Sequence, residues 1–184
     1  PQLLKHETSL PVGMLEEFLP KSVEDTSSYD FEETLDDLIR FAKGLRSIHT
    51  DLDQVWGDGK PEHFRYDMKG KPKLDDFGTA SSESWRFEEK KATGDFLYRA
   101  PETFNDYFTV HKSNDIFSFG AVAYYMMTGE ELNKDLFEEV TSEETDLLPK
   151  IRAYEDFMAD ADTKTLDSYY KRKINAHKDK IPNR

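Results

Sequence analysis

The sequence predicts a mainly α-helical domain with a few short β-strands. A strong 3.6-residue apolar period over residues 33–49 indicates an amphipathic helix. Residues 114–128 are apolar around nearly the whole helical circumference, which is typical of a helix buried on all sides. Between these segments, short apolar pieces alternate with Gly and Pro, which favours short strands joined by turns. We therefore expect a mainly helical fold, with short strands near residues 55–75.

The N-terminal part of the sequence predicts a strand followed by a helix. Residues 10–20 read as a short strand that ends in a turn, and residues 21–30 are a polar loop. Asp30, with Glu33 three residues later, has the pattern of a helix N-cap and its capping-box partner. The helix should run to about His49. Its predicted apolar face consists of Leu35, Leu38, Ile39, Ala42, Leu45 and Ile48.

Short strands and a long loop are expected in the middle of the chain. Residues 55–56, 64–66 and 73–74 are candidate strands, and residues 68–72 favour a turn. Residues 79–95 are polar and rich in Ser, Thr and Lys. A loop of that length in a compact domain is usually functional or disordered.

The C-terminal part of the sequence is expected to be helical. Gly129 should end the buried helix, because glycine readily adopts the left-handed conformation that follows many helices. Residues 130–184 are first acidic and then basic, and their apolar residues recur at helical spacing. The sequence has no internal repeat. We expect residues 1–184 to form a single domain.

Composition and charge argue against several classes of protein. Thirteen Phe, nine Tyr and two Trp argue against a disordered chain, because such rings need a core. The net charge of −13 argues against partners such as nucleic acid or an anionic membrane. No apolar run approaches the roughly 20 residues that span a bilayer. The absence of Cys excludes disulfides and thiol nucleophiles, and it fits an intracellular location in the cytoplasm or nucleus.

Four short stretches carry the functional information. They are WGDGKPEH (56–63), DDFGTA (75–80), YRAPE (98–102) and SNDIFSFG (113–120). Each one is weak alone, but they follow one another in an order and at a spacing that resemble the large lobe of the protein kinase family. The resemblance covers about residues 10–130, whereas residues 131–184 share only helical character.

Each stretch is similar to a known part of that lobe. Residues 58–62 retain the Asp, Lys, Pro and Glu of the catalytic loop. The Asp-Phe-Gly tripeptide at 76–78 resembles the metal-binding loop, at the distance from the catalytic loop that the family typically shows. Residues 100–102 resemble the end of the activation segment, and residues 113–120 resemble the start of the family's buried central helix. The resemblance implies a C-terminal lobe that is a helical bundle around a buried central helix. In such a lobe, a few short strands carry the catalytic and metal loops.

The resemblance implies ATP-dependent phosphoryl transfer to Ser or Thr of a protein substrate. Catalysis of this kind depends mostly on positioning and electrostatics. Asp58 would orient the substrate hydroxyl and accept its proton, and Lys60 would reach toward the transferred phosphate. In the family, an Asp-x-Lys arrangement accompanies Ser/Thr rather than Tyr specificity. Asp76 would supply an oxygen ligand to Mg²⁺ that bridges the phosphates of ATP.

Further roles are implied outside the catalytic loop. EEFLP (16–20) resembles the hinge between the two lobes, so the backbone of Glu17 and Leu19 would meet the adenine edge. Asp115 would hold the catalytic-loop backbone by hydrogen bonds. A structural ion pair is expected for Glu102, with Arg184 or Arg152 as its partner.

Several residues depart from the family pattern in the catalytic and activation segments. Trp56 and Gly57 replace His-Arg, and Asp95 replaces the usual Thr of the substrate-binding segment. Gly57 cannot supply the Arg that clamps a phosphorylated activation loop. Phosphorylation is therefore not expected to activate the protein by that route at Thr79, Ser81, Ser82 or Thr93.

Two departures affect the metal and nucleotide. His63 replaces the second metal-binding Asn, and an imidazole is a softer donor than oxygen. Either one metal is lost or Mn²⁺ is favoured, unless His63 is simply a hydrogen-bonded structural residue. Arg65 stands where an aliphatic side chain usually packs under the adenine. Its guanidinium could stack on the base or block it.

Three hypotheses for function remain open. The chain begins at Pro1, and the glycine-rich loop and phosphate-anchoring Lys of the family have no counterpart, so we expect an absent N-terminal lobe and an inactive fragment. An active Ser/Thr kinase is favoured by Asp58, Lys60 and Asp76. A pseudokinase that serves as a binding module is favoured by the departures described above. A small-molecule phosphotransferase is disfavoured by residues 100–102, which serve protein substrates.

Overall fold

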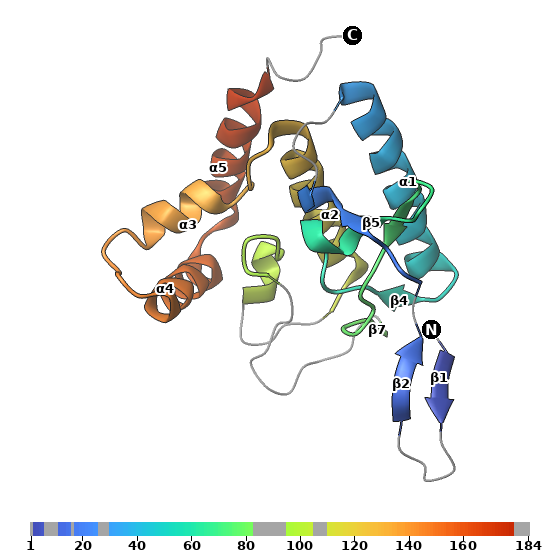
Figure 1. The fold of residues 1–184 in the computed structure, drawn as a ribbon. Helices are drawn as coiled ribbons and strands as arrows, with labels where there is room; N and C mark the ends of the chain where they lie inside the picture. The colour runs from blue at the N-terminus through green and yellow to red at the C-terminus, as the bar shows by residue number, and fades with distance from the viewer. Residues whose placement is uncertain are drawn as a thin grey trace.

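The computed structural model describes residues 2–5, 11–15, 17–25, 30–82, 95–104 and 110–178. The described residues are mainly helical with a few short strands, as the sequence predicts. In Figure 1, α2 lies between α1 on one side and a group of three helices on the other. The helices are α1 (Phe31–Thr50), α2 (Lys112–Thr128), α3 (Lys134–Val140), α4 (Leu147–Asp160) and α5 (Thr163–Ala176).

The strands form three small antiparallel sheets. Strands β1 (Gln2–Lys5) and β2 (Pro11–Leu15) form a hairpin that projects from the rest of the domain (Figure 1). The second sheet has the order β3-β5-β6, and its strands are β3 (Lys21–Ser22), β5 (Phe64–Tyr66) and β6 (Pro72–Leu74). The third sheet pairs β4 (Gln54–Val55) with β7 (Ser81–Ser82).

The three strands predicted between residues 55 and 75 are confirmed to within one residue as β4, β5 and β6. The strand predicted over 10–20 is shorter, because β2 ends at Leu15. The turn predicted at 68–72 is also present, with Gly70 at φ +72° donating its N–H to the Asp67 carbonyl. Most of the predicted loop, residues 83–94, lies outside the described residues.

Helix α1 begins as predicted, but its buried face is shifted. The Asp30 carboxylate accepts hydrogen bonds from the N–H groups of Glu32 (2.9 Å) and Glu33 (3.2 Å). Ile39 is 46% exposed, so its predicted place on the inner face is wrong, and Ala42 is exposed as well. The inner stripe instead includes Phe41 and alternates spacings of three and four residues. It consists of Thr34, Leu38, Phe41, Leu45 and Ile48.

Helix α2 organises the main core. Ala121, Val122 and Met126 of α2 pack in one cluster with Phe41, Trp56 and other buried residues. Gly129 ends the helix in the left-handed conformation, at φ +75°, as predicted. The prediction that this helix is buried on all sides is wrong, because Ile116 in its first turns is 58% exposed.

A second core joins α3, α4 and α5 beside α2. Tyr154, which is fully buried, lies at its centre and contacts the rings of Phe96, Phe104 and Phe137. Short 3-10 turns complete the fold: η1 (Val23–Asp25), η2 (Pro61–His63) and η3 (Pro101–Phe104). Among the described residues, no helix is long and apolar enough to cross a membrane.

Candidate active site

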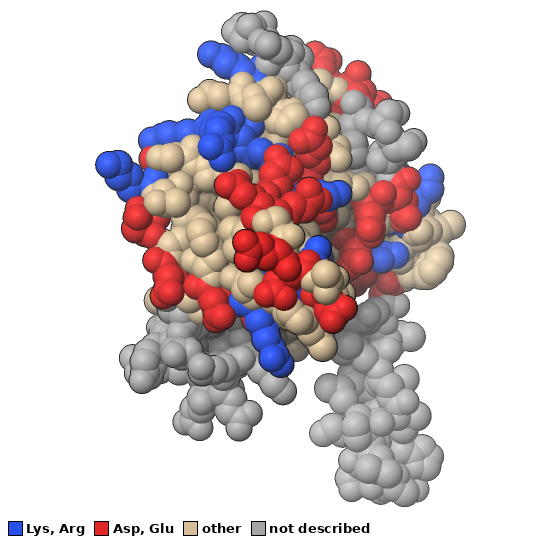
Figure 2. Space-filling view, turned by 90° about the vertical axis from the view of Figure 1, so that its left-hand side faces the viewer, with Lys and Arg blue, Asp and Glu red and all other residues tan. Residues whose placement is uncertain are grey.

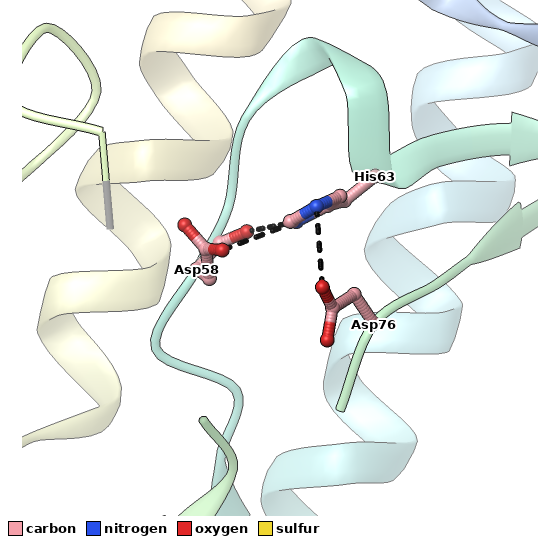
Figure 3. A group of neighbouring side chains, drawn as sticks. All are labelled: Asp58, His63 and Asp76. Atoms are coloured by element: carbon pink, nitrogen blue, oxygen red, sulfur yellow. Dashed lines mark hydrogen bonds and ion pairs between the residues drawn. The ribbon is translucent and has the colours of Figure 1, made fainter. Parts of the chain in front are cut away.

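Three side chains from separate segments meet at one place (Figure 3). Asp58 lies in the loop between β4 and η2, His63 ends η2, and Asp76 follows β6. One potential ligand atom of each residue lies within 4.8 Å of the others. A group of two carboxylates and one imidazole at that spacing is suited to bind a divalent cation.

The backbone before Asp58 is held by a buried carboxylate at the start of α2. Asp115 is 2% exposed, and its two oxygens accept hydrogen bonds from the N–H groups of Trp56 and Gly57, both at 2.8 Å. These are bonds of the kind that the sequence predicts for Asp115. The ring of His49 also lies 2.8 Å from this carboxylate. The sequence offers no indication of the His49 contact, because the two residues are close only in the folded chain.

Trp56 connects the loop of Asp58 to the loop of Asp76. Its indole is buried, and its N–H donates to the backbone carbonyls of Asp75 (3.1 Å) and Asp76 (2.9 Å). The Thr79 hydroxyl donates to the Trp56 carbonyl at 2.9 Å. The aromatic side chain therefore fixes the separation between the two loops through the backbone.

The hydrogen bonds of His63 determine which ring nitrogen is available. Nδ1 lies 2.8 Å from the Asp58 backbone carbonyl, which can only accept, so we assign the proton to Nδ1. Nε2 then presents a lone pair and lies 3.6 Å from Oδ2 of Asp76. Two acceptors that face each other at this distance are stabilised by a cation between them.

Asp58 and Lys60 lie side by side, with opposite charges. The Asp58 Oδ2 atom is 3.9 Å from the Lys60 ammonium, and within the described residues its buried Oδ1 atom has no hydrogen-bond partner. Burial raises the pKa of the Asp58 carboxyl, although His63 and Lys60 oppose the increase. A carboxylate with a raised pKa is better able to accept a proton.

Lys60 is held by acidic neighbours. Its ammonium lies 3.1 Å from the Glu62 carboxylate. Burial tends to lower the pKa of Lys60, but the Glu62 hydrogen bond and the charge of Asp58 raise it overall. Lys60 is therefore a fixed positive charge beside Asp58.

The backbone at Asp76 directs its carboxylate outward. Asp76 has φ +52°, a left-handed conformation that is uncommon for a residue other than glycine. Its Oδ1 atom accepts a hydrogen bond from the Gly78 N–H at 3.1 Å, and the side chain is 55% exposed. The carboxylate is thus accessible to a ligand that approaches from solvent.

The other residues that are predicted to bind the nucleotide form a separate group near β5. The Arg65 guanidinium donates two hydrogen bonds to the Leu19 carbonyl, from Nε at 3.0 Å and from Nη2 at 2.5 Å. It also lies 3.5 Å from the Asp75 carboxylate. Glu17 pairs with Lys73 at 3.1 Å. Arg65 therefore joins the predicted hinge segment to the start of the metal loop.

Glu102 makes a hydrogen bond in the structure, and one of its two predicted ion-pair partners can be checked. Glu102 accepts from the Asn114 amide at 2.9 Å, which connects η3 to α2. In the part of the chain that the structure describes, Glu102 makes no ion pair with Arg152, and Arg184 lies outside it. The Asn114 amide thus gives the Glu102 carboxylate a hydrogen-bond donor within the fold.

Comparison with known proteins identifies the family. A model described as the protein kinase domain matches residues 12–176. The chain belongs to the protein kinase family. The leucine-rich repeat receptor-like protein kinase PEPR2 of Arabidopsis thaliana is 29% identical over 125 residues, which cover 66% of this chain and 11% of that kinase. The chain thus spans about a tenth of the length of this relative. The match also includes α3, α4 and α5, where the sequence resemblance rests on helical character alone.

Proposed function

We propose that this kinase-family chain is the C-terminal lobe of a Ser/Thr protein kinase and carries the residues for phosphoryl transfer from ATP. The observation that carries the proposal is the convergence of Asp58, His63 and Asp76 within 4.8 Å, next to the Lys60 ammonium. In this proposal residues 1–184 form one domain, and residues 16–20 act as the hinge between the two lobes of the kinase.

Each residue has a role that follows from its surroundings. Asp58, whose Oδ1 atom has no hydrogen-bond partner among the described residues and whose pKa is raised by burial, orients the substrate hydroxyl and accepts its proton. Lys60 places a positive charge beside the transferred phosphoryl group. Asp76 and the Nε2 atom of His63 would hold a divalent cation, Mg²⁺ or Mn²⁺. A bound cation of this kind neutralises negative charge on the phosphates.

The nucleotide base would lie near β5. The backbone groups of Glu17 and Leu19 meet the adenine edge, and the Arg65 guanidinium lies below the ring. Because Arg65 is already hydrogen-bonded to the Leu19 carbonyl, its planar face is oriented without further ordering. A guanidinium held in this way can stack on an aromatic base.

The test is phosphoryl transfer by the longest available form of the protein to Ser, Thr and Tyr peptide libraries. We expect transfer to Ser or Thr, and a decrease of about 10²-fold or more in Asp58→Asn, which cannot accept the proton. Asp36→Asn, an exposed change on α1, is the matched control and should leave the rate unchanged. Equal rates in Asp58→Asn and the wild-type protein would refute the assignment of Asp58.

A pseudokinase is the second candidate, and Arg65 favours it. Its guanidinium could occupy the space of the base instead of supporting it, since Leu19, Glu62 and Asp75 all hold it in place. Thermal shift with ATP and each metal separates the two functions. Stabilisation by ATP and metal that Asp76→Ala abolishes supports the kinase; no stabilisation with either metal supports the pseudokinase.

A further inference from the structure

The outer side of α5 carries a row of lysines. Lys164 and Lys171 lie on the helix, and Lys178 follows two residues after its last residue, Ala176. All three lysines are exposed, and they recur at intervals of seven residues. Seven residues make about two helical turns, so neighbouring lysines of the row lie on one side of α5, about 10.5 Å apart along its axis.

The positive charge of this row is not balanced within the fold. Among the described residues, Lys164 and Lys178 make no ion pair, whereas Lys171 lies 2.6 Å from Asp167. Both side chains of that pair are more than half exposed, so water and a partner compete with it easily. Asp167 is the one acidic residue in the sequence between positions 164 and 178. The row is therefore a local excess of positive charge on a chain of net charge −13.

The inner side of α5 is anchored, which fixes the backbone that carries the row. Leu166 and Tyr169 are buried in the second core, and the Tyr169 hydroxyl donates to the Leu132 carbonyl at 2.8 Å. Lys173 is also buried, and its ammonium donates to the Asp135 carboxylate at 2.5 Å. Because the helix is already ordered, a partner that binds the row has to order only the lysine side chains.

The surroundings of the row favour a narrow protein partner over a membrane or a nucleic acid. Figure 2 faces the side of the molecule where α3, α4 and α5 lie in Figure 1, and Asp and Glu spread across its middle, beside its largest group of Lys and Arg. A membrane surface or a long duplex would bring its phosphates against these carboxylates. Ile174, which is 53% exposed, lies three residues after Lys171 and four before Lys178, so it offers an apolar contact on the same side of the chain.

We propose that the row of lysines binds a partner protein through an acidic α-helix that carries Asp or Glu at every seventh residue. Two helices that pack nearly parallel rise equally per residue, so a charge match at one lysine is repeated at the next. Ile174 contacts an apolar residue between the carboxylates of the partner. The Debye length at physiological salt is about 8 Å, so the nearby lysines outweigh the net charge of the chain. The proposal is independent of the proposed function, because the row includes none of Asp58, His63 and Asp76.

The experiment measures binding of two labelled helical peptides to the longest available form of the protein by fluorescence anisotropy. The peptides have the same composition, with Glu at every seventh residue in one and at every fifth residue in the other, which scatters the charges around the helix. The first peptide should bind more tightly. Lys164→Gln and Lys178→Gln should each raise its Kd about two- to fivefold, the range for one exposed ion pair. The matched control is Lys43→Gln on α1, an exposed lysine that makes no ion pair among the described residues and should leave the Kd unchanged.

Equal affinity for the two peptides overturns the proposal, as does an equal loss of affinity in Lys43→Gln. A single-stranded oligonucleotide and vesicles of phosphatidylcholine and phosphatidylserine in equal parts are the probes for the other classes of partner. If either probe binds more tightly than the first peptide and Lys164→Gln weakens it, the row serves a nucleic acid or a membrane and the proposal is wrong. Sedimentation of the protein alone tests a second copy as the partner: self-association that Lys164→Gln abolishes also overturns the proposal.

Discussion

At the residue scale, we expect His63 to determine which metal the proposed site prefers. Its Nδ1 atom is committed to the Asp58 carbonyl, so only Nε2 faces Asp76. Imidazole nitrogen binds Mn²⁺ more readily than Mg²⁺, which prefers oxygen ligands. We therefore expect this single side chain to shift the proposed site away from Mg²⁺, which the two carboxylates would favour.

His63→Asn should reverse this preference, because it replaces the nitrogen donor by an amide oxygen. We expect the ratio of the rate with Mn²⁺ to the rate with Mg²⁺ to fall about tenfold, a size of effect that changes around metal ligands commonly have. Phosphoryl transfer at a series of concentrations of each metal measures the ratio. His63→Ala, which offers no donor, is the comparison and should weaken both metals. An unchanged ratio in His63→Asn would show that His63 does not contact the metal.

At the scale of elements, the site depends on how α2 meets the loop that carries Asp58. The first turns of α2 contribute Asp115, whose buried carboxylate accepts from two backbone N–H groups and contacts His49 on α1. One side chain thus connects two helices and the catalytic loop. Its loss would leave several polar groups without partners at once.

Asp115→Ala should lower the free energy of unfolding by about 3 kcal/mol, because it leaves buried donors unsatisfied. Urea unfolding followed by circular dichroism measures the change. Asp156→Ala removes an exposed carboxylate on α4 and should change the free energy by less than about 0.5 kcal/mol. If Asp115→Ala were as stable as this control, the hydrogen bonds of Asp115 would contribute nothing to the fold.

Whether the sequence predicts an element depends on whether that element carries a local sequence signal. Helix α1 and strands β4 to β6 carry local information in their period, cap and turn residues, and the sequence predicts them well. Strands β3 and β7 have two residues each and form only because β5 and β4 lie beside them, so no local pattern indicates them. Phe41 is buried in place of Ile39 because the packing of α1 against Phe64 and Tyr66 selects its inner face.

The candidate site likewise combines features that the sequence predicts with contacts that it does not predict. The order of the sequence motifs predicts that Asp58 and Asp76 act together, and the structure places both next to His63. The contact between Arg65 and the Leu19 carbonyl, and the approach of Glu131 to Tyr98, join residues far apart in the chain. Side-chain conformation and tertiary packing decide such contacts, so they could not be predicted from spacing.

At the scale of the whole molecule, the excess of acidic residues shapes the surface. The chain has 38 Asp and Glu against 25 Lys and Arg. In Figure 2, Asp and Glu side chains spread across the middle of the face shown, whereas the largest group of Lys and Arg lies at the upper left and others are scattered among the acidic side chains. Exposed ion pairs such as Lys171–Asp167, at 2.6 Å, contribute little to stability in water. We therefore expect repulsion among the remaining carboxylates to outweigh these pairs and to destabilise the compact state.

Screening this repulsion should stabilise the protein. We expect an increase in NaCl from about 50 to 500 mM at pH 8 to raise Tm by about 2–4 °C, equivalent to about 1 kcal/mol in a domain of this size. The increase should be smaller at pH 5, because protons on some carboxylates reduce the net charge. Differential scanning fluorimetry measures Tm, and choline chloride as a second salt distinguishes screening from specific binding of Na⁺. A Tm that falls with salt at pH 8 would mean that attractive pairs, such as Lys173 with Asp135, outweigh the repulsion.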